Sequence, residues 1–160
     1  MENDQTIARK ALLDYLERPR AHVSLKEAAA DMSEHLINKT LEGVPYSCWG
    51  LLEHIRTSQR DMVDFMENPE YKEMKWPDDF WPDPKTKATK AMWDGSVAAY
   101  EKDLAHLKDV VKDPKTDLFA RIPWGEGQTV FREVMQIIDH AAYHTGELVL
   151  ARRMMGSWPA

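Results

Sequence analysis

The chain has 160 residues, of which 43% are hydrophobic and 30% are charged, and its formal net charge is −6. This length suits a single domain, residues 1–160, whose core is large enough to fold without disulfides. The composition excludes a disordered chain, and the acidic balance disfavours binding to a phosphate backbone. No apolar run has the length needed to cross a bilayer. We therefore expect neither nucleic acid nor a membrane as a partner.

The cellular compartment is indicated by cysteine usage and by the first residues. Cys48 is the only cysteine, so no internal disulfide can form, which suits a reducing compartment. Residues 1–5 are polar and acidic, unlike the basic and apolar start of a signal peptide. We therefore expect a cytoplasmic protein. Cys48 lies on the apolar face of a predicted helix, which favours a buried core residue over a nucleophile.

Long stretches with 3.6-residue periodicity predict an all-α fold. The first helix is predicted over residues 5–17 and is stopped by Pro19, whose ring cannot continue the backbone ladder. Ser24 and Glu27 form a capping-box pattern, in which each side chain pairs with the other residue's backbone N–H. This pattern predicts a short helix that ends near Asp31.

A further helical turn or two is predicted over residues 33–41, ending at Gly43. The first long central helix is predicted to start at Ser47, a suitable N-cap, and to end at Glu67, before Asn-Pro. Its core-facing seam repeats at spacings of four and three residues. The seam consists of Cys48, Leu52, Ile55, Gln59, Met62 and Met66.

A loop rich in Trp and Pro follows over residues 70–85, and loops of this length are uncommon unless they serve a function. The next helix is predicted over residues 86–111. After a second loop, residues 117–127, the last helix is predicted over residues 129–155, with Thr129 as its cap. Four helices joined by connections of moderate length predict a four-helix bundle.

Histidines provide the candidate metal ligands. His140 and His144 are four residues apart on the last predicted helix, so their Cβ atoms lie roughly 5–6 Å apart on one face. Two imidazoles so placed can bind one ion, and His54, beside the seam of its helix, is the candidate third ligand. The spacing alone also fits one surface histidine and one core histidine. The other histidines are expected at the surface or at caps: His22, His35 and His106.

Two motifs carry a resemblance to a known family. The first is Pro-Tyr-Ser-Cys-Trp-Gly-Leu-Leu-Glu-His-Ile, residues 45–55, and the second is Asp-His-Ala-Ala-Tyr-His-Thr-Gly-Glu, residues 139–147. With the Trp-Pro loop between them, they resemble the DinB-like (YfiT-like) metalloenzymes over nearly the whole chain. The resemblance implies an up-down-down-up four-helix bundle, often a homodimer, which binds one divalent ion, commonly nickel or zinc. The ligands that it implies are His54, His140 and His144.

Three neutral imidazoles leave coordination positions open, which is typical of a catalytic site. The reactive group is then a metal-bound water or a metal-bound thiolate. The resemblance implies transfer or isomerisation with a low-molecular-weight thiol, such as bacillithiol or mycothiol, for some members, and hydrolysis for others. We therefore expect an S-transferase or a hydrolase with a small-molecule substrate. The alternatives are a non-catalytic metal-binding stress-response module and an interaction protein whose histidines have no function.

Residues near the three histidines are candidates for hydrogen-bond partners of the imidazoles and for the walls of a pocket. Glu133 shares a helix face with His140, and Glu147, where the resembled family more often has Gln, lies one turn after His144. Either carboxylate is expected to accept a hydrogen bond from an imidazole or to lie on a solvated face. Four tryptophans either form an apolar wall beside the metal or pack the loops onto the bundle. They are Trp49, Trp76, Trp81 and Trp124.

Overall fold

The computed structural model describes residues 4–18 and 21–159, and within these ranges the chain forms six α-helices and no β-strand. The predicted all-α class is therefore confirmed. No helix in this part of the chain combines the length and the apolarity that crossing a membrane requires. The helices are α1 (Asp4–Glu17), α2 (Leu25–Ala29), α3 (Glu34–Ile37), α4 (Cys48–Glu67), α5 (Lys90–Lys112) and α6 (Val130–Met154).

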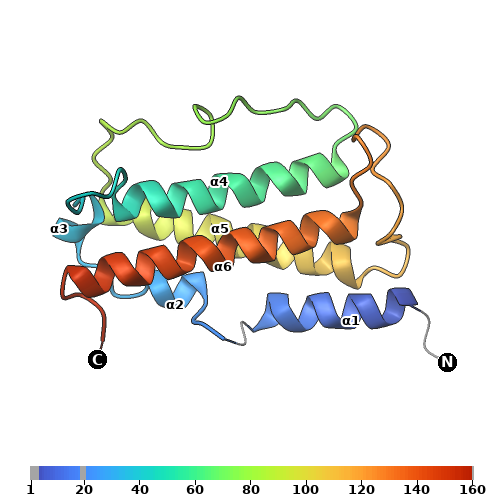
Figure 1. Cartoon of the computed structure of the whole chain (residues 1–160), viewed down its shortest axis with the longest axis horizontal. Helices are drawn as coiled ribbons and strands as arrows, with labels where there is room; N and C mark the ends of the chain where they lie inside the picture. The colour runs from blue at the N-terminus through green and yellow to red at the C-terminus, as the bar shows by residue number, and fades with distance from the viewer. Residues whose placement is uncertain (1–3, 19–20, 160) are drawn as a thin grey trace.

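The long helices lie side by side (Figure 1). α4 packs against both α5 and α6, and α1 packs against α5 and α6. In Figure 1, α1 and α6 run from right to left, whereas α4 and α5 run from left to right. The segment between α4 and α5, residues 68–89, runs back along the length of α4. This path brings loop residues close to the middle of α4.

Side-chain caps start the helices where the sequence predicts them. In the capping box of α2, the Ser24 hydroxyl accepts from the Glu27 N–H at 3.2 Å, and the Glu27 carboxylate accepts from the Ser24 N–H at 2.8 Å. Ser47 caps α4 and Thr129 caps α6 through their hydroxyl oxygens. The stop predicted at Pro19 lies outside the described residues.

The predicted start of α5 is wrong by four residues, since the helix begins at Lys90 rather than at Thr86. The cause is a contact from a distant part of the chain. The side chain of Asn38 donates to the carbonyl of Ala88 and accepts from its N–H, both at 2.8 Å. Both backbone polar groups of Ala88 are thus bound by a side chain from another part of the chain, and Thr89 is the N-cap of the helix.

The two short helices are shorter than predicted. α2 ends at Ala29 rather than near Asp31, because Ala30 adopts an extended conformation and Asp31 has a positive φ of 52°. A non-glycine residue with such a φ cannot continue a right-handed helix. α3 covers only Glu34–Ile37.

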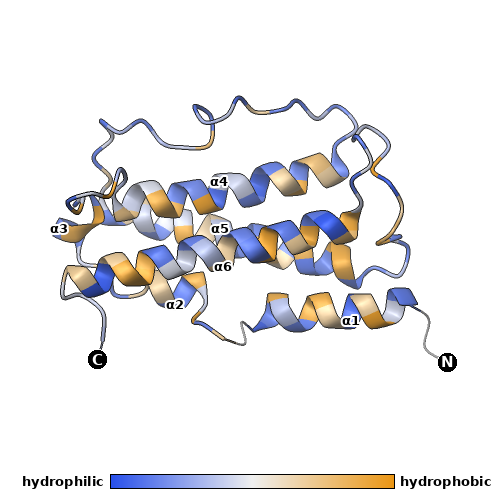
Figure 2. Ribbon diagram, in the orientation of Figure 1, coloured by the Kyte–Doolittle hydropathy of each residue, from blue (hydrophilic) through white to orange (hydrophobic). Residues whose placement is uncertain are grey.

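The apolar core has two parts, and Figure 2 shows apolar and polar stretches on each long helix. One cluster surrounds the buried Trp93 and includes Leu148 of α6, whereas the other surrounds Leu107 and includes Ile137 of α6. The stretch of α6 between the two clusters contains His140 and His144. The predicted seam of α4 is buried except for Met62, which is partly exposed. Buried polar side chains of α4 also lie near this junction: His54, Ser58 and Gln59.

Arg152 ties α6 to two other parts of the chain. It is only 2% exposed, and its guanidinium donates to the carbonyls of Ala28 and Ala30 at 2.7 Å and to the carbonyl of Ser157 at 2.8 Å. These bonds hold the end of α2 and the residues after α6 against the helix.

We predict that Arg152→Lys lowers the free energy of unfolding by about 2–4 kcal/mol, because an ammonium group cannot reproduce the fork of donors and leaves buried carbonyls unpaired. Denaturant unfolding followed by circular dichroism measures this loss. The matched control is Arg153→Lys, since Arg153 is exposed and its replacement should change stability by less than about 0.5 kcal/mol. Equal stabilities of the two variants would contradict the structural role of Arg152.

Candidate metal centre

The structure brings together the three histidines that the sequence singles out. His54 comes from α4, and His140 and His144 come from α6; one ring nitrogen of each lies within 4.8 Å of the others. The Nε2 atoms of His54 and His140 are 3.1 Å apart. His54 is 2% exposed, whereas the other two are partly buried. The cluster therefore spans two packed helices and is largely shielded from water.

The spacing of the nitrogens fits a shared metal ion. Two nitrogens that ligate one ion at about 2.0–2.1 Å lie roughly 3 Å apart, and the His54 and His140 nitrogens meet this value. The donor set is three imidazoles, which suits divalent transition metals. The cluster can therefore hold a metal ion, and its chemistry does not select one metal.

Hydrogen bonds on the outer side of the cluster orient two of the rings. The Nδ1 atom of His54 lies 3.0 Å from the carbonyl oxygen of Phe80, and the Nδ1 atom of His144 lies 2.6 Å from a carboxylate oxygen of Glu147. Both acceptors require a proton on Nδ1, which leaves the lone pair on Nε2. The other carboxylate oxygen of Glu147 accepts from the hydroxyl of Tyr46 at 2.7 Å.

Aromatic rings from the loop cover His54. Trp81 stacks on the His54 ring at a centroid distance of 4.0 Å and an interplanar angle of 4°, and Tyr46 stacks on Trp81 at 5.2 Å. Trp76, although 66% exposed, contacts His54 edge-on at 6.1 Å. Trp49 is buried in the core instead. Of the four tryptophans, Trp76 and Trp81 are thus the ones in contact with the histidine cluster.

The structure places Glu133 and Trp124 elsewhere. Glu133 is buried and paired with Arg132, and the indole N–H of Trp124 donates to the Phe65 carbonyl at 2.6 Å. Both line a cavity of about 490 Å³ together with Asp61. Glu133 shares the face of His140, but a separation of seven residues is about 10 Å along a helix, which is too far for a hydrogen bond.

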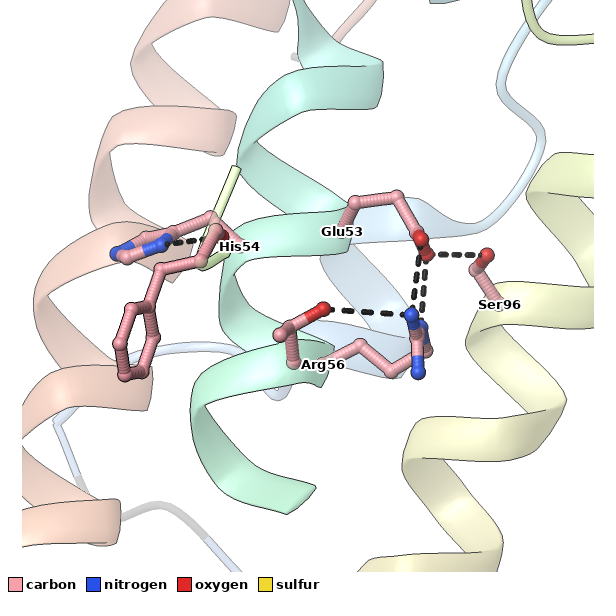
Figure 3. A network of polar contacts seen from close by, with 6 residues as sticks. Glu53, His54, Arg56 and Ser96 are labelled. Atoms are coloured by element: carbon pink, nitrogen blue, oxygen red, sulfur yellow. Dashed lines mark hydrogen bonds and ion pairs between the residues drawn. The ribbon is translucent and has the colours of Figure 1, made fainter. Parts of the chain in front are cut away.

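Glu53, next to His54 in the sequence, points to the opposite side of α4, as Figure 3 shows. Its carboxylate accepts from Ser96 of α5 at 2.6 Å and from Arg56 at 2.8 Å. Burial alone would raise the pKa of Glu53, but these hydrogen bonds and the charge of Arg56 lower it overall. Glu53 therefore fastens α4 to α5 while His54 faces α6.

Two contacts of the cluster were not predicted from the sequence. The Phe80 acceptor is a backbone carbonyl, which no residue type identifies. Tyr46 lies in the 45–55 motif, directly before the Ser47 cap. Its place in this motif is the feature of the sequence that could have predicted its contact with the cluster.

Burial favours the neutral form of His54 and of His140. It lowers the pKa of His54, and it lowers the pKa of His140 to about 4, with the neighbouring His144 and His54 adding to the effect. Neutral imidazoles are the form that binds metals. Burial also raises the pKa of the Cys48 thiol to about 11, which agrees with a core residue rather than a nucleophile.

An all-helical chain with three converging histidines on two packed helices defines the DinB-like (YfiT-like) class that the two motifs resemble. More specifically, the family model for mycothiol S-transferase matches residues 11–156, and the chain belongs to this family. The resemblance noted from the motifs is therefore confirmed. No curated protein and no solved structure matches the chain.

The histidine cluster predicts how stability depends on pH in protein stripped of metal by a chelator. The pKa of His140 is about 4 in the folded chain against an ordinary 6.5, so between these values the unfolded chain binds a proton that the folded chain does not. The free energy of unfolding should therefore fall as the pH falls from 6.5 to 4, with His140 contributing at most about 1.4 kcal/mol per pH unit. Denaturant unfolding at several pH values measures the slope.

His140→Gln should reduce this slope. His22→Gln is the control, because His22 is exposed and lies outside the cluster, and it should keep the wild-type slope. A wild-type slope in His140→Gln would show that His140 does not titrate as its burial requires.

Proposed function

We propose that the chain is a metal-dependent S-transferase that uses mycothiol, with His54, His140 and His144 holding one divalent ion, nickel or zinc. The observation that carries the proposal is the convergence of three imidazoles in a chain of the mycothiol S-transferase family. The family supplies the thiol substrate, and the cluster supplies a site where a thiol can be activated. Neither nucleic acid nor a membrane takes part.

The proposed architecture is that of the resembled class. It is a single domain, residues 1–160, in which α1, α4, α5 and α6 form an up-down-down-up four-helix bundle. The packing of α4 on α5 and α6, and of α1 on α5 and α6, supports this arrangement. A cytoplasmic location and a homodimer complete the proposal.

A divalent ion in this site would lower the pKa of a coordinated thiol and so favour the nucleophilic thiolate. In the reaction, the thiol sulfur forms a bond to an electrophilic carbon, the leaving group departs with its bonding electrons, and the thiol proton passes to solvent. The protein's own groups prepare the site. Glu147 holds the proton on Nδ1 of His144, and the Phe80 carbonyl holds that of His54. Trp81 covers one face of the His54 ring.

Hydrolysis through the same three histidines is the alternative reaction, and a metal-binding module without catalysis is the alternative role. Membership of an S-transferase family favours thiol transfer over both. Metal analysis and a turnover assay distinguish thiol transfer, hydrolysis and metal binding without catalysis.

We predict that purified protein retains about one equivalent of nickel or zinc, and that adding the ion to the stripped protein raises its melting temperature, because an ion at 100 times its dissociation constant stabilises by about 2.7 kcal/mol. Replacing any one of His54, His140 and His144 by Ala should abolish both effects. His106→Ala is the control, since His106 is exposed and pairs with Glu67. Metal analysis and thermal denaturation measure the outcome, and unchanged metal content in His144→Ala would refute the ligand set.

We also predict turnover of mycothiol with a soft electrophile such as monochlorobimane. His144→Ala should lower the rate at least about 100-fold, because a Lewis acid contributes several kcal/mol. Cys48→Ala should leave the rate near that of the wild type, because the reacting sulfur comes from the thiol substrate and Cys48 is buried. Hydrolysis of esters or amides without any thiol would favour the hydrolase, and activity that survives His144→Ala would exclude catalysis at this site.

A further inference from the structure

A cavity of about 470 Å³ lies between the segment that leads into α4 and the end of the loop that precedes α5. Its volume falls within the range of about 300–1,000 Å³ that is common for small-molecule sites. The walls combine aromatic rings with hydroxyl and carboxylate groups. Lining residues include Tyr46, Trp49, Trp81, Thr40, Asp83 and Thr86.

This cavity adjoins the histidine cluster through two of its walls. Trp81 lines the cavity and stacks on His54 at 4.0 Å. Tyr46 lines it too, and its hydroxyl bonds the carboxylate that holds His144. The cavity and the histidine cluster therefore share Trp81 and Tyr46 as neighbours.

The lining has the chemistry that binds a sugar. Aromatic rings pack against the C–H faces of a pyranose, whereas hydroxyl and carboxylate groups bond its hydroxyls, and the bond to an ionised carboxylate is the stronger one. Trp49 adds a buried indole N–H that has no partner among the described residues. An unpaired buried donor costs about 1–3 kcal/mol, so a hydroxyl placed next to it would be stabilised.

We propose that this cavity binds the glucosaminyl-inositol part of mycothiol, while the cysteinyl sulfur reaches the histidine cluster past the edge of Trp81. The inference rests on the proposed function and extends it by locating the sugar of the thiol. Mycothiol consists of an acetylated cysteine joined by an amide to glucosaminyl-inositol, and the pseudodisaccharide is its only large polyol.

Distance and size disfavour two of the other cavities. Five covalent bonds separate the sulfur from the sugar ring, which is at most roughly 7 Å by ordinary bond lengths. The cavity around Asp61 and Glu133 is two helical turns, about 10 Å, from His54 and His140, so a sugar there would hold the sulfur too far away. The cavity beside Cys48 and Leu150 measures about 80 Å³ and is too small.

The inference is tested by filling the cavity with a tryptophan side chain and measuring whether the sugar part of mycothiol still binds. The probe is N-acetylglucosaminyl-inositol, which lacks the cysteine, and isothermal titration calorimetry measures its binding to the metal-loaded protein. Thr86→Trp places an indole in the cavity, whereas Ala105→Trp adds the same side chain at an exposed site on α5 outside the cavity. Thr40→Trp fills the cavity from its other lining segment and serves if Thr86→Trp does not fold.

We expect the wild type and Ala105→Trp to bind the probe saturably. The filled variants should weaken this binding and raise KM for mycothiol by at least about 10-fold, with kcat and bound metal unchanged. Probe affinity or KM in a folded Thr86→Trp or Thr40→Trp equal to that of the wild type would overturn the inference.

Failure of the probe to bind a wild type that turns over mycothiol would also overturn the inference, and the proposed function would stand. A metal-loaded wild type that does not turn over mycothiol would remove the proposed function, and the inference with it.

Discussion

Three imidazole nitrogens face one another between α4 and α6, and the rest of the site follows from holding them there. Two ring nitrogens 3.1 Å apart need a proton or a cation between them, because facing lone pairs repel each other. Without an ion, a neutral His140 can place its own proton there by carrying it on Nε2, and burial disfavours a second proton, since it lowers the pKa of both His54 and His140. The same arrangement could hold a cation that the three imidazoles share, and imidazole suits divalent transition metals.

The groups that orient these rings come from separate parts of the chain. The loop of residues 68–89 is one of them and contributes directly to the histidine cluster. It supplies the Phe80 carbonyl and the Trp81 ring, which fix the tautomer and the plane of His54. Glu147 accepts two hydrogen bonds, from His144 and from Tyr46. A glutamine, which the resembled family more often has here, offers a single acceptor oxygen and could not serve both donors in the same way. The carboxylate of Glu147 thus links Tyr46, in the motif of residues 45–55, to His144.

The sequence predicted well what depends on neighbouring residues. The caps at Ser24, Ser47 and Thr129 are local patterns, and so is the spacing of His140 and His144. His54 depended on the resemblance, because nothing in its own helix says which residue of another helix it faces. The errors have different causes. The start of α5 is delayed by Asn38, fifty residues away, and Glu133 was favoured for sharing a face although the axial rise carries it about 10 Å from His140.

The position of the centre explains why its polar residues are tolerated. It occupies the junction of two apolar clusters, one ending at Ile137 and the other including Leu148 on α6. A continuous apolar core there would bury more hydrocarbon and leave fewer polar groups to satisfy, so His54, Ser58 and Gln59 cost stability relative to apolar side chains. Buried polar groups that weaken a core persist mainly where function needs them. An ion held by the three histidines would join α4 to α6 where apolar packing between the clusters is interrupted, so metal binding and the packing of the two helices would stabilise each other.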